Sequence, residues 1–404
     1  MSDETGFPTR PLTRRQVVAS ALGGASASIV GMRVKAADGL APRAPGIPPS
    51  AHGERAPGAE LSRIPKFGVV SLTPLEALHG TITPADLHFE RHHSGIPDLD
   101  PERHELILHG FVDRPLKWRV QDLMRYPSVT RTCFIECSGN YFPLAGEESP
   151  PHLVCGLTSQ SEWTGVPLSA LLREAGVRKG ASWVLAEGAD AALMSRSIPL
   201  EKALDDALVV YAQNGEAIRP AQGYPLRLLL PGWEGNTNVK WLRRLEVTDG
   251  PSMARDETSK YTEPLLDNTI RQFSFDIEAR SIITSPAYPA AIEPGWHEIR
   301  GIAWSGRGRI HRVEVSTDGG ISWRDARLQG PVLPKAHTRF GLAWKWDGQS
   351  TELQSRAIDD TGYVQPTLAA ILRERGPGSG PYHFNPIAGW RVLRDGRLRF
   401  SPTG

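Results

Sequence analysis

In this 404-residue sequence, Cys137 is the residue whose sequence context most strongly suggests a chemical role. It ends an apolar run and stands directly before Ser-Gly-Asn, in the stretch RTCFIECSGNYF (131–142). Binding and catalytic residues concentrate in loops that follow rigid elements, but a free cysteine is also a common buried packing residue. The local sequence leaves three roles open for Cys137: half of a disulfide, a packing residue, or a ligand.

The chain has three cysteines, and this number restricts the disulfide alternative. An odd count leaves at least one thiol without a partner inside the chain. If residues 131–137 form a strand, four steps of about 3.3 Å separate Cys133 from Cys137 by roughly 13 Å. A disulfide needs Cα atoms within about 7 Å, so these two cannot bond to each other. Cys155 can in principle reach either one.

Three further segments carry groups that could belong to a site. HFERHHSG (88–95) combines an arginine with neighbouring histidines, and it is either a solvated loop or part of a site. Arg227 and Lys240 fall in or beside apolar strands, where a cation is costly unless it meets an anion. Each is therefore a paired structural cation or an anion-binding residue. Tyr261 lies in the polar stretch ARDETSKYTE, where a lone tyrosine indicates little.

The elements that must position these residues form two regions. Between residues 67 and 250, apolar runs at 104–112 and 131–137 predict strands, and leucines spaced by three and four residues predict a helix over 168–175. Asn214-Gly215 is a strong hairpin signal. This pattern predicts an α+β domain.

The second region starts near residue 270 and contains short strands separated by glycine turns every 8 to 12 residues. Such spacing is typical of a β-sandwich of immunoglobulin-like architecture. The predicted organisation is a catalytic α+β domain over 67–250, a connector over 251–269 and the sandwich over 270–404.

The N-terminal residues are interpreted as a targeting segment. Arg14 and Arg15 precede about sixteen weakly apolar residues, too short and mild for a membrane span, so residues 1–37 resemble a twin-arginine export signal and predict a periplasmic protein. A frayed helix is the alternative. Residues 38–66 form a Pro/Gly-rich leader.

The net charge of +1, without a basic stripe, argues against nucleic-acid binding.

The segments singled out above together resemble the sulfite oxidase-like molybdenum enzymes. The resemblance covers nearly the whole chain after the leader. The matching motif residues are Phe89, Arg91 and His93 (Phe-x-Arg-x-His), Cys137, Gly139 and Asn140 (Cys-x-Gly-Asn), Gly223, Tyr224, Pro225 and Arg227, and Val239, Lys240 and Trp241. The resemblance implies a molybdopterin-binding domain of sulfite oxidase type, followed by a sandwich domain that forms a homodimer.

The resemblance also implies roles for individual residues. Cys137 would be a thiolate ligand of molybdenum, which favours sulfur. Tyr261, Arg91 and Arg227 would orient the substrate and stabilise negative charge. The residues expected to bind Mo-molybdopterin are Phe89, Arg91, His92, His93, Gln222, Arg227, Asn238, Val239 and Lys240. Whether Asp190 or Gln222 contacts the pterin itself stays open.

Within the family, ECSGN, DETSKYTE and the tail YHFNPI are most similar to molybdenum subunits of sulfane dehydrogenases from the thiosulfate-oxidising Sox system. That likeness implies oxidation of a sulfane sulfur, bound to the cysteine of a carrier protein, to the sulfonate level. Two departures from sulfite oxidases support it: Tyr141 and Phe142 stand where those enzymes have arginines, and Gln222 replaces a histidine. A site with fewer cations and more aromatic side chains suits a sulfur atom attached to a protein, whereas free sulfite, a dianion, would favour more cations.

The sequence contains no CxxCH haem-attachment motif, so electrons would leave the chain to a separate acceptor. The resemblance implies a c-type cytochrome subunit. The alternatives are a sulfite dehydrogenase acting on free sulfite, a periplasmic sulfoxide reductase and, from a different class, a non-catalytic secreted binding protein.

Overall fold

The protein is described by a computed structural model that covers residues 49, 51–56, 58, 61–141, 145–376 and 382–402. The chain divides into a unit over Met1–Pro57 and a compact unit over Gly58–Gly404. The predicted export signal and most of the predicted leader lie outside the described residues.

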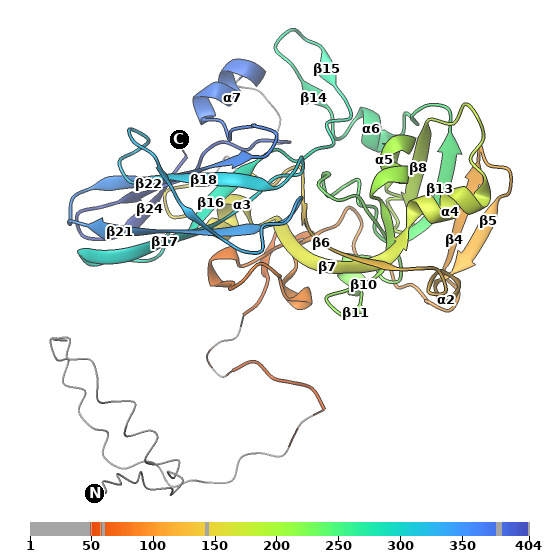
Figure 1. Cartoon of the computed structure of the whole chain (residues 1–404), viewed down its shortest axis with the longest axis horizontal. Helices are drawn as coiled ribbons and strands as arrows, with labels where there is room; N and C mark the ends of the chain where they lie inside the picture. Colours follow the sequence, from red (N-terminus) through yellow and green to blue (C-terminus); the bar gives the residue numbers. More distant parts are fainter. Residues whose placement is uncertain are drawn as a thin grey trace, which may run out of the picture. The chain divides into compact units, whose positions relative to one another are not determined.

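The α+β region is built on two sheets, whose strands Figure 1 labels. The first has the order β11 (Glu216–Ala217), β10 (Leu208–Gln213), β7 (Thr158–Pro167), β6 (Val129–Glu136), with β12 (Arg227–Leu229) also paired to β10. The second has the order β5 (Leu116–Arg119), β4 (Glu105–Gly110), β13 (Leu242–Thr248), β8 (Trp183–Gly188), β9 (Ser195–Pro199). In the second sheet β13 runs parallel to β4 and the other pairs are antiparallel.

Short helices accompany these sheets: α2 (Val120–Leu123), α3 (Pro151–Cys155), α4 (Leu168–Ala175) and α5 (Leu200–Asp205). The predicted leucine spacing is that of α4, because Leu168, Leu171 and Leu172 are all fully buried in one core with strands of both sheets. Gly176 ends α4 at φ 73°, a conformation that favours glycine. Asn214-Gly215 forms the predicted hairpin between β10 and β11.

The C-terminal region is a β-sandwich. Its sheets have the orders β16 (Arg280–Ser285), β17 (Gly295–Trp304), β21 (Thr338–Trp346), β20 (Arg327–Gln329) and β19 (Arg324–Asp325), β18 (Ile310–Ser316), β22 (Thr351–Asp359), β23 (Gly389–Val392), β24 (Leu398–Ser401). Trp304, Phe340, Trp390 and Phe400 are buried in one core drawn from both sheets. The structure thus confirms the predicted α+β domain followed by a sandwich. It also contains α7 (Leu368–Arg375).

The regions predicted as leader and connector both contain regular secondary structure. A small sheet of β1 (Ile64–Lys66), β2 (Val70–Leu72) and β3 (Glu90–Arg91) begins inside the predicted leader. The connector predicted for 251–269 holds α6 (Arg255–Thr258) and β14 (Glu263–Pro264), which pairs with β15 (Ile270–Arg271) in the hairpin seen beside α7 in Figure 1. No helix in the described part of the chain is long and apolar enough to cross a membrane.

Candidate active site

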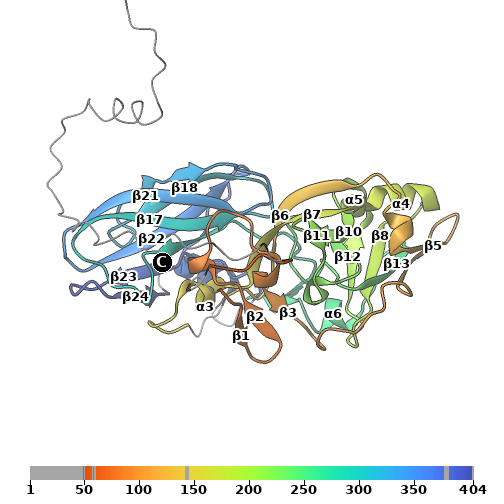
Figure 2. The same ribbon diagram turned by 90° about the horizontal axis from the view of Figure 1, so that it is seen from below.

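A pocket with an empty volume of about 630 Å³ gathers every site residue predicted from the sequence. It draws on β3, the loop after β6, the segment from Gln222 to Trp241 and the chain after α6. Figure 2 shows β3, β6 and α6 from below the view of Figure 1. The pocket also contains residues that the sequence did not assign to it: Met194, Gly235, Asn236 and Trp241, as well as Asp190.

Cys137 lies one residue beyond the end of β6 and faces this pocket. Its thiol is free, as are those of Cys133 and Cys155. The backbone N–H of Cys137 donates to the carbonyl of Leu157 (3.0 Å), and its own carbonyl accepts from the N–H of Asn140 (2.9 Å). Burial raises the pKa of the Cys137 thiol. The backbone therefore holds the cysteine in place, and its sulfur atom, which accepts from the backbone N–H of Gly139, faces the pocket.

Gly235 explains how a second pocket loop approaches this cysteine. Its N–H donates to the carbonyl of Glu136 at 2.6 Å. A Cβ atom at position 235 would lie 2.8 Å from that oxygen atom and 3.4 Å from the Cα of Cys137. Only glycine allows the two loops to lie this close.

Glu136 ties the cysteine loop to the sandwich domain. Its carboxylate is buried and accepts hydrogen bonds from Arg280 Nη1 (2.7 Å), Asn140 Nδ2 (2.8 Å) and the indole N–H of Trp304. Arg280 Nη1 also donates to the backbone carbonyl of Asn140 at 2.6 Å. The two flanks of Cys137 are thus fixed from the C-terminal region.

Arg227 is a buried cation without a carboxylate partner in the described part of the chain. Nη1 donates to the carbonyl (3.0 Å) and Oε1 (3.2 Å) of Gln222. Nε is buried and has no hydrogen-bond partner among the described residues. Burial lowers the pKa of Arg227 to about 9. A charge in this setting needs an anion, and the described residues do not supply one.

Lys240 lies beside Arg227, joined to it by an antiparallel bridge. Nζ contacts the carbonyls of Arg91 (3.2 Å) and Ala221 (3.1 Å) and Nδ1 of His92 (2.8 Å). These contacts use all three donors of an ammonium group, so in this arrangement Lys240 has no N–H left for a further acceptor. Burial, followed by the charge of Arg227, lowers the pKa of Lys240 well below its ordinary value.

His92 is neutral, because burial and then Lys240 lower its pKa to about 3. With Nδ1 accepting from Lys240, the ring proton is on Nε2, which donates to Glu90 Oε2 at 3.0 Å. His92 therefore orients Lys240 from the side of β3.

Three predicted cofactor residues shape the walls through backbone contacts. Gln222 Nε2 donates to the carbonyl of Phe89 (2.7 Å), whose N–H donates to Ser159 Oγ (2.9 Å). Asn238 Oδ1 accepts from the N–H of Leu230 (2.7 Å), and Nδ2 donates to the carbonyl of Glu234 (3.0 Å). Both amide side chains thus hold the loops that line the pocket.

Tyr261 closes another wall. Its hydroxyl group lies 2.9 Å from Nε2 of His93. The ring contacts the guanidinium of Arg196, with Cζ 4.9 Å from the ring centre, and the ring of Tyr382 at 5.3 Å. Tyr261 has φ 48°, which is uncommon for a bulky residue and occurs at functional sites. Burial raises the pKa of its phenol.

One expectation about the wall is wrong. Tyr141 does not line the pocket but packs against Phe384, 4.6 Å between ring centres, in a small cluster with Ile371. Aromatic side chains do face the pocket, but they are Phe89, Trp241 and Tyr261. Phe142 lies outside the described residues.

The donor set fits an anionic, sulfur-bound metal cofactor. Arg91, Arg227 and Lys240 face the pocket together with one carboxylate, that of Asp190, which accepts from the N–H of Met194 at 3.1 Å. The buried Nε of Arg227 has no hydrogen-bond partner among the described residues and could bind an anion. The free thiol of Cys137 could bind a metal that prefers sulfur ligands. A molybdenum dithiolene with a phosphate group meets both requirements.

Comparison with known proteins agrees with this geometry. Residues 93–255 match the oxidoreductase molybdopterin binding domain and residues 271–388 match the Mo-co oxidoreductase dimerisation domain. Mitochondrial sulfite oxidase of Rattus norvegicus is 32% identical over 75% of this chain, which spans 60% of that protein. Sulfite oxidase of Gallus gallus is also 32% identical, over 75% of this chain and 72% of the relative.

Among solved structures, the sulfane dehydrogenase SoxCD from Paracoccus pantotrophus is similar, with a TM-score of 0.85 and 43% sequence identity. The match covers 89% of this chain and 96% of that one. The cofactor of this chain is accordingly Mo-molybdopterin. This chain belongs to the sulfite oxidase family of molybdopterin oxidoreductases.

Proposed function

We propose that the protein is the molybdenum subunit of a sulfane dehydrogenase, which oxidises a sulfane sulfur carried on a cysteine of a carrier protein to the sulfonate level. The observation that supports this most directly is the 43% identity to a sulfane dehydrogenase across 96% of its chain, against 32% to the sulfite oxidases.

The reaction balances with water as the source of oxygen. A persulfide anion takes up three oxygen atoms from three water molecules and becomes a sulfonate, with release of six protons and six electrons. When bound, the molybdenum supplies two-electron oxidation coupled to oxygen transfer, so three rounds are needed. The electrons pass to a c-type cytochrome, which is the acceptor class that we propose.

The residues of the chain would bind and orient the substrate. Cys137 would hold the metal, and Arg91 and Arg227 would stabilise negative charge as oxygen is added, because fixed cations in a partly dry pocket act strongly. The hydroxyl of Tyr261 would contact the oxidised sulfur, with His93 at 2.9 Å as its proton partner. An uncharged aromatic wall beside these cations accommodates a protein-bound sulfur arm.

The test compares two substrates with the purified, molybdenum-loaded protein and an oxidised c-type cytochrome. Carrier protein bearing a cysteine persulfide should reduce the cytochrome with up to six electrons per sulfane sulfur, and free sulfite should react far more slowly. The same carrier with its cysteine alkylated is the control. Fast turnover of free sulfite at micromolar concentration, with no reaction of the loaded carrier, would contradict the proposal.

A sulfite dehydrogenase is the second candidate, and the identity to two animal sulfite oxidases favours it. The substrate comparison above separates the two activities. Both would use the same cations, because sulfite and a protein-bound sulfonate are both anionic.

We further propose a periplasmic homodimer. The match to a dimerisation domain over 271–388 supports assembly through the sandwich, and the paired Arg14 and Arg15 support twin-arginine export. Light scattering should give twice the chain mass, and replacing both arginines with lysine should leave the protein in the cytoplasm.

A further inference from the structure

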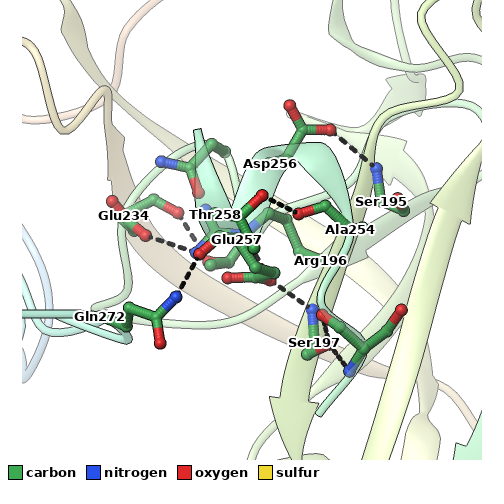
Figure 3. A network of polar contacts seen from close by, with 12 residues as sticks. Ser195, Arg196, Ser197, Glu234, Ala254, Asp256, Glu257, Thr258 and Gln272 are labelled. Atoms are coloured by element: carbon green, nitrogen blue, oxygen red, sulfur yellow. Dashed lines mark hydrogen bonds and ion pairs between the residues drawn. The ribbon is translucent and has the colours of Figure 1, made fainter. Parts of the chain in front are cut away.

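Arg196 on β9 is enclosed by two carboxylates and the aromatic face of Tyr261. Its side chain is fully buried. Nε donates to Oε1 of Glu257 at 2.9 Å, and Nη2 forms an ion pair with Oε1 of Glu234 at 3.0 Å. Figure 3 shows the guanidinium between these two residues. Arg196 is not among the residues that line the pocket, so it reaches the site only through its neighbours.

The guanidinium stays charged in this position. Burial disfavours the charge, but the carboxylates of Glu234 and Glu257 outweigh it and raise the pKa of Arg196. Nη1 and Nη2 are both buried and form no hydrogen bond with a described residue, although Nη2 lies 3.0 Å from Oε1 of Glu234. The remaining contact of the group is the ring of Tyr261, 4.9 Å from Cζ, which is within the range of a cation–π interaction.

Glu257 connects the same arginine to the backbone around Tyr261. It lies on α6, four residues before the tyrosine, and its Oε1 also accepts from the N–H of Ser197 at 2.7 Å. The carbonyl of Glu257 accepts from Gln272 Nε2 at 2.7 Å (Figure 3). These contacts hold α6 against β9. The left-handed backbone of Tyr261, φ 48°, persists only where surrounding contacts of this kind fix it.

We propose that Arg196 is a positioning residue, which fixes the ring of Tyr261 at the pocket wall through the cation–π contact and holds α6 through Glu257. The inference rests on the proposed function, in which the hydroxyl of Tyr261 contacts the substrate. Arg196 itself would touch neither the substrate nor the cofactor.

The first test observes the environment of the Tyr261 ring directly and does not depend on enzyme activity. The chain has eight tyrosines, so protein labelled with 3-fluorotyrosine gives a ¹⁹F NMR spectrum in which the resonance lost in Tyr261→Phe identifies this ring. Arg196→Lys keeps the charge but not the planar fork, and Glu257→Gln keeps the arginine but weakens its tie to α6. Both should shift or broaden the Tyr261 resonance.

The matched control is Arg356→Lys, because Arg356 pairs with Glu314 at 2.5 Å and lies 4.2 Å from the ring centre of Trp323, within the sandwich. It should leave the Tyr261 resonance unchanged. An unchanged resonance in Arg196→Lys, with the protein folded, would overturn the positioning role.

The second test is a double-mutant cycle in the molybdenum-loaded enzyme. Arg196→Lys should lower kcat about tenfold with little change in KM, whereas in the Tyr261→Phe background the same change should cost less than about twofold. An equal loss in both backgrounds would show that Arg196 affects kcat independently of the Tyr261 hydroxyl and would overturn the inference. If Tyr261→Phe itself keeps full activity, the catalytic role of Tyr261 fails, while the NMR result still decides whether Arg196 positions the ring.

Discussion

Arg280, the first residue of β16, donates a hydrogen bond of 2.7 Å to Glu136, the residue directly before Cys137. The same Nη1 atom donates to the carbonyl of Asn140 on the other side of the cysteine. The sandwich domain thus contributes to the geometry of the proposed metal ligand, although it supplies none of the predicted site residues.

Arg280→Met should destabilise the protein and reduce its molybdenum content. Removing one partner of a buried ion pair leaves an uncompensated charge and costs about 3–5 kcal/mol. The additional change Glu136→Gln should recover part of that loss, since the remaining group is then neutral. Urea unfolding and metal analysis measure both effects. Arg178→Met, which breaks an exposed pair with Asp113, is the control and should cost less than about 1 kcal/mol. Equal losses in the two single variants would contradict the prediction.

Cys137→Ser should keep the fold but lose turnover. The thiol accepts from the backbone N–H of Gly139, a contact that a serine hydroxyl can also make, and the backbone contacts of the residue do not depend on its side chain. Because altering even the outer partners of a metal ligand costs about 10–100-fold, loss of the ligand should cost at least about 100-fold in kcat. Cys155→Ala, which changes a buried cysteine away from the pocket, should retain activity. A serine variant as active as the parent would rule out the ligand role.

Arg227→Met should have opposite effects on the cofactor-free and the loaded protein. Arg227 has no carboxylate partner in the described part of the chain, so without cofactor its buried charge is a cost that methionine removes. Thermal unfolding of protein from a molybdenum-deficient host should show an equal or higher Tm. Protein from a molybdenum-replete host should contain much less metal than the parent. A normal metal content would show that Arg227 does not hold the cofactor.

His383 makes stability depend on pH. Its ring lies between Glu278 (3.1 Å) and Glu234 (3.3 Å). Burial opposes the charge, but the carboxylates, Glu278 first, raise the pKa of His383 to about 10. A raised pKa means that the stabilisation is fully present below the ordinary pKa of 6.5 and is lost as the pH rises toward about 10. The free energy of unfolding of the parent should therefore fall across this window, whereas that of His383→Gln should change less. Parallel pH profiles of the two proteins would contradict this account.

The sequence predicted the parts of the site that local patterns encode. The apolar run of β6 ends at Glu136, so the position of Cys137 at a strand end followed from periodicity. The helix over 168–175 followed from the spacing of its leucines. Arg91, His93 and Arg227 were recognised through motif resemblance, because β3 has only two residues and β12 only three, too few for any period.

Other features depend on contacts between distant residues, and these had no local signal. Arg196 lies in a strand whose sequence has no distinguishing pattern. Its partners Glu234 and Glu257 come much later in the chain. All three donors of Lys240 are engaged, two of them by the backbone carbonyls of Arg91 and Ala221. No sequence motif predicts these contacts. Tyr141 was misplaced for the same reason, since its ring packs against Phe384 from the far end of the chain.

The pairing of Glu136 with Arg280 and of Glu234 with His383 has a consequence for how the gene can be divided. A truncated polypeptide that stops before β16 would leave Glu136 without Arg280, and Glu234 with Arg196 as its remaining ion-pair partner. Of its three side-chain hydrogen-bond donors, Glu136 would then keep only the amide of Asn140, so the strand end that carries the cysteine would lose its support from the sandwich. Expression of the N-terminal half alone should yield material that fails to capture metal, and adding the missing half in trans should be needed to recover it.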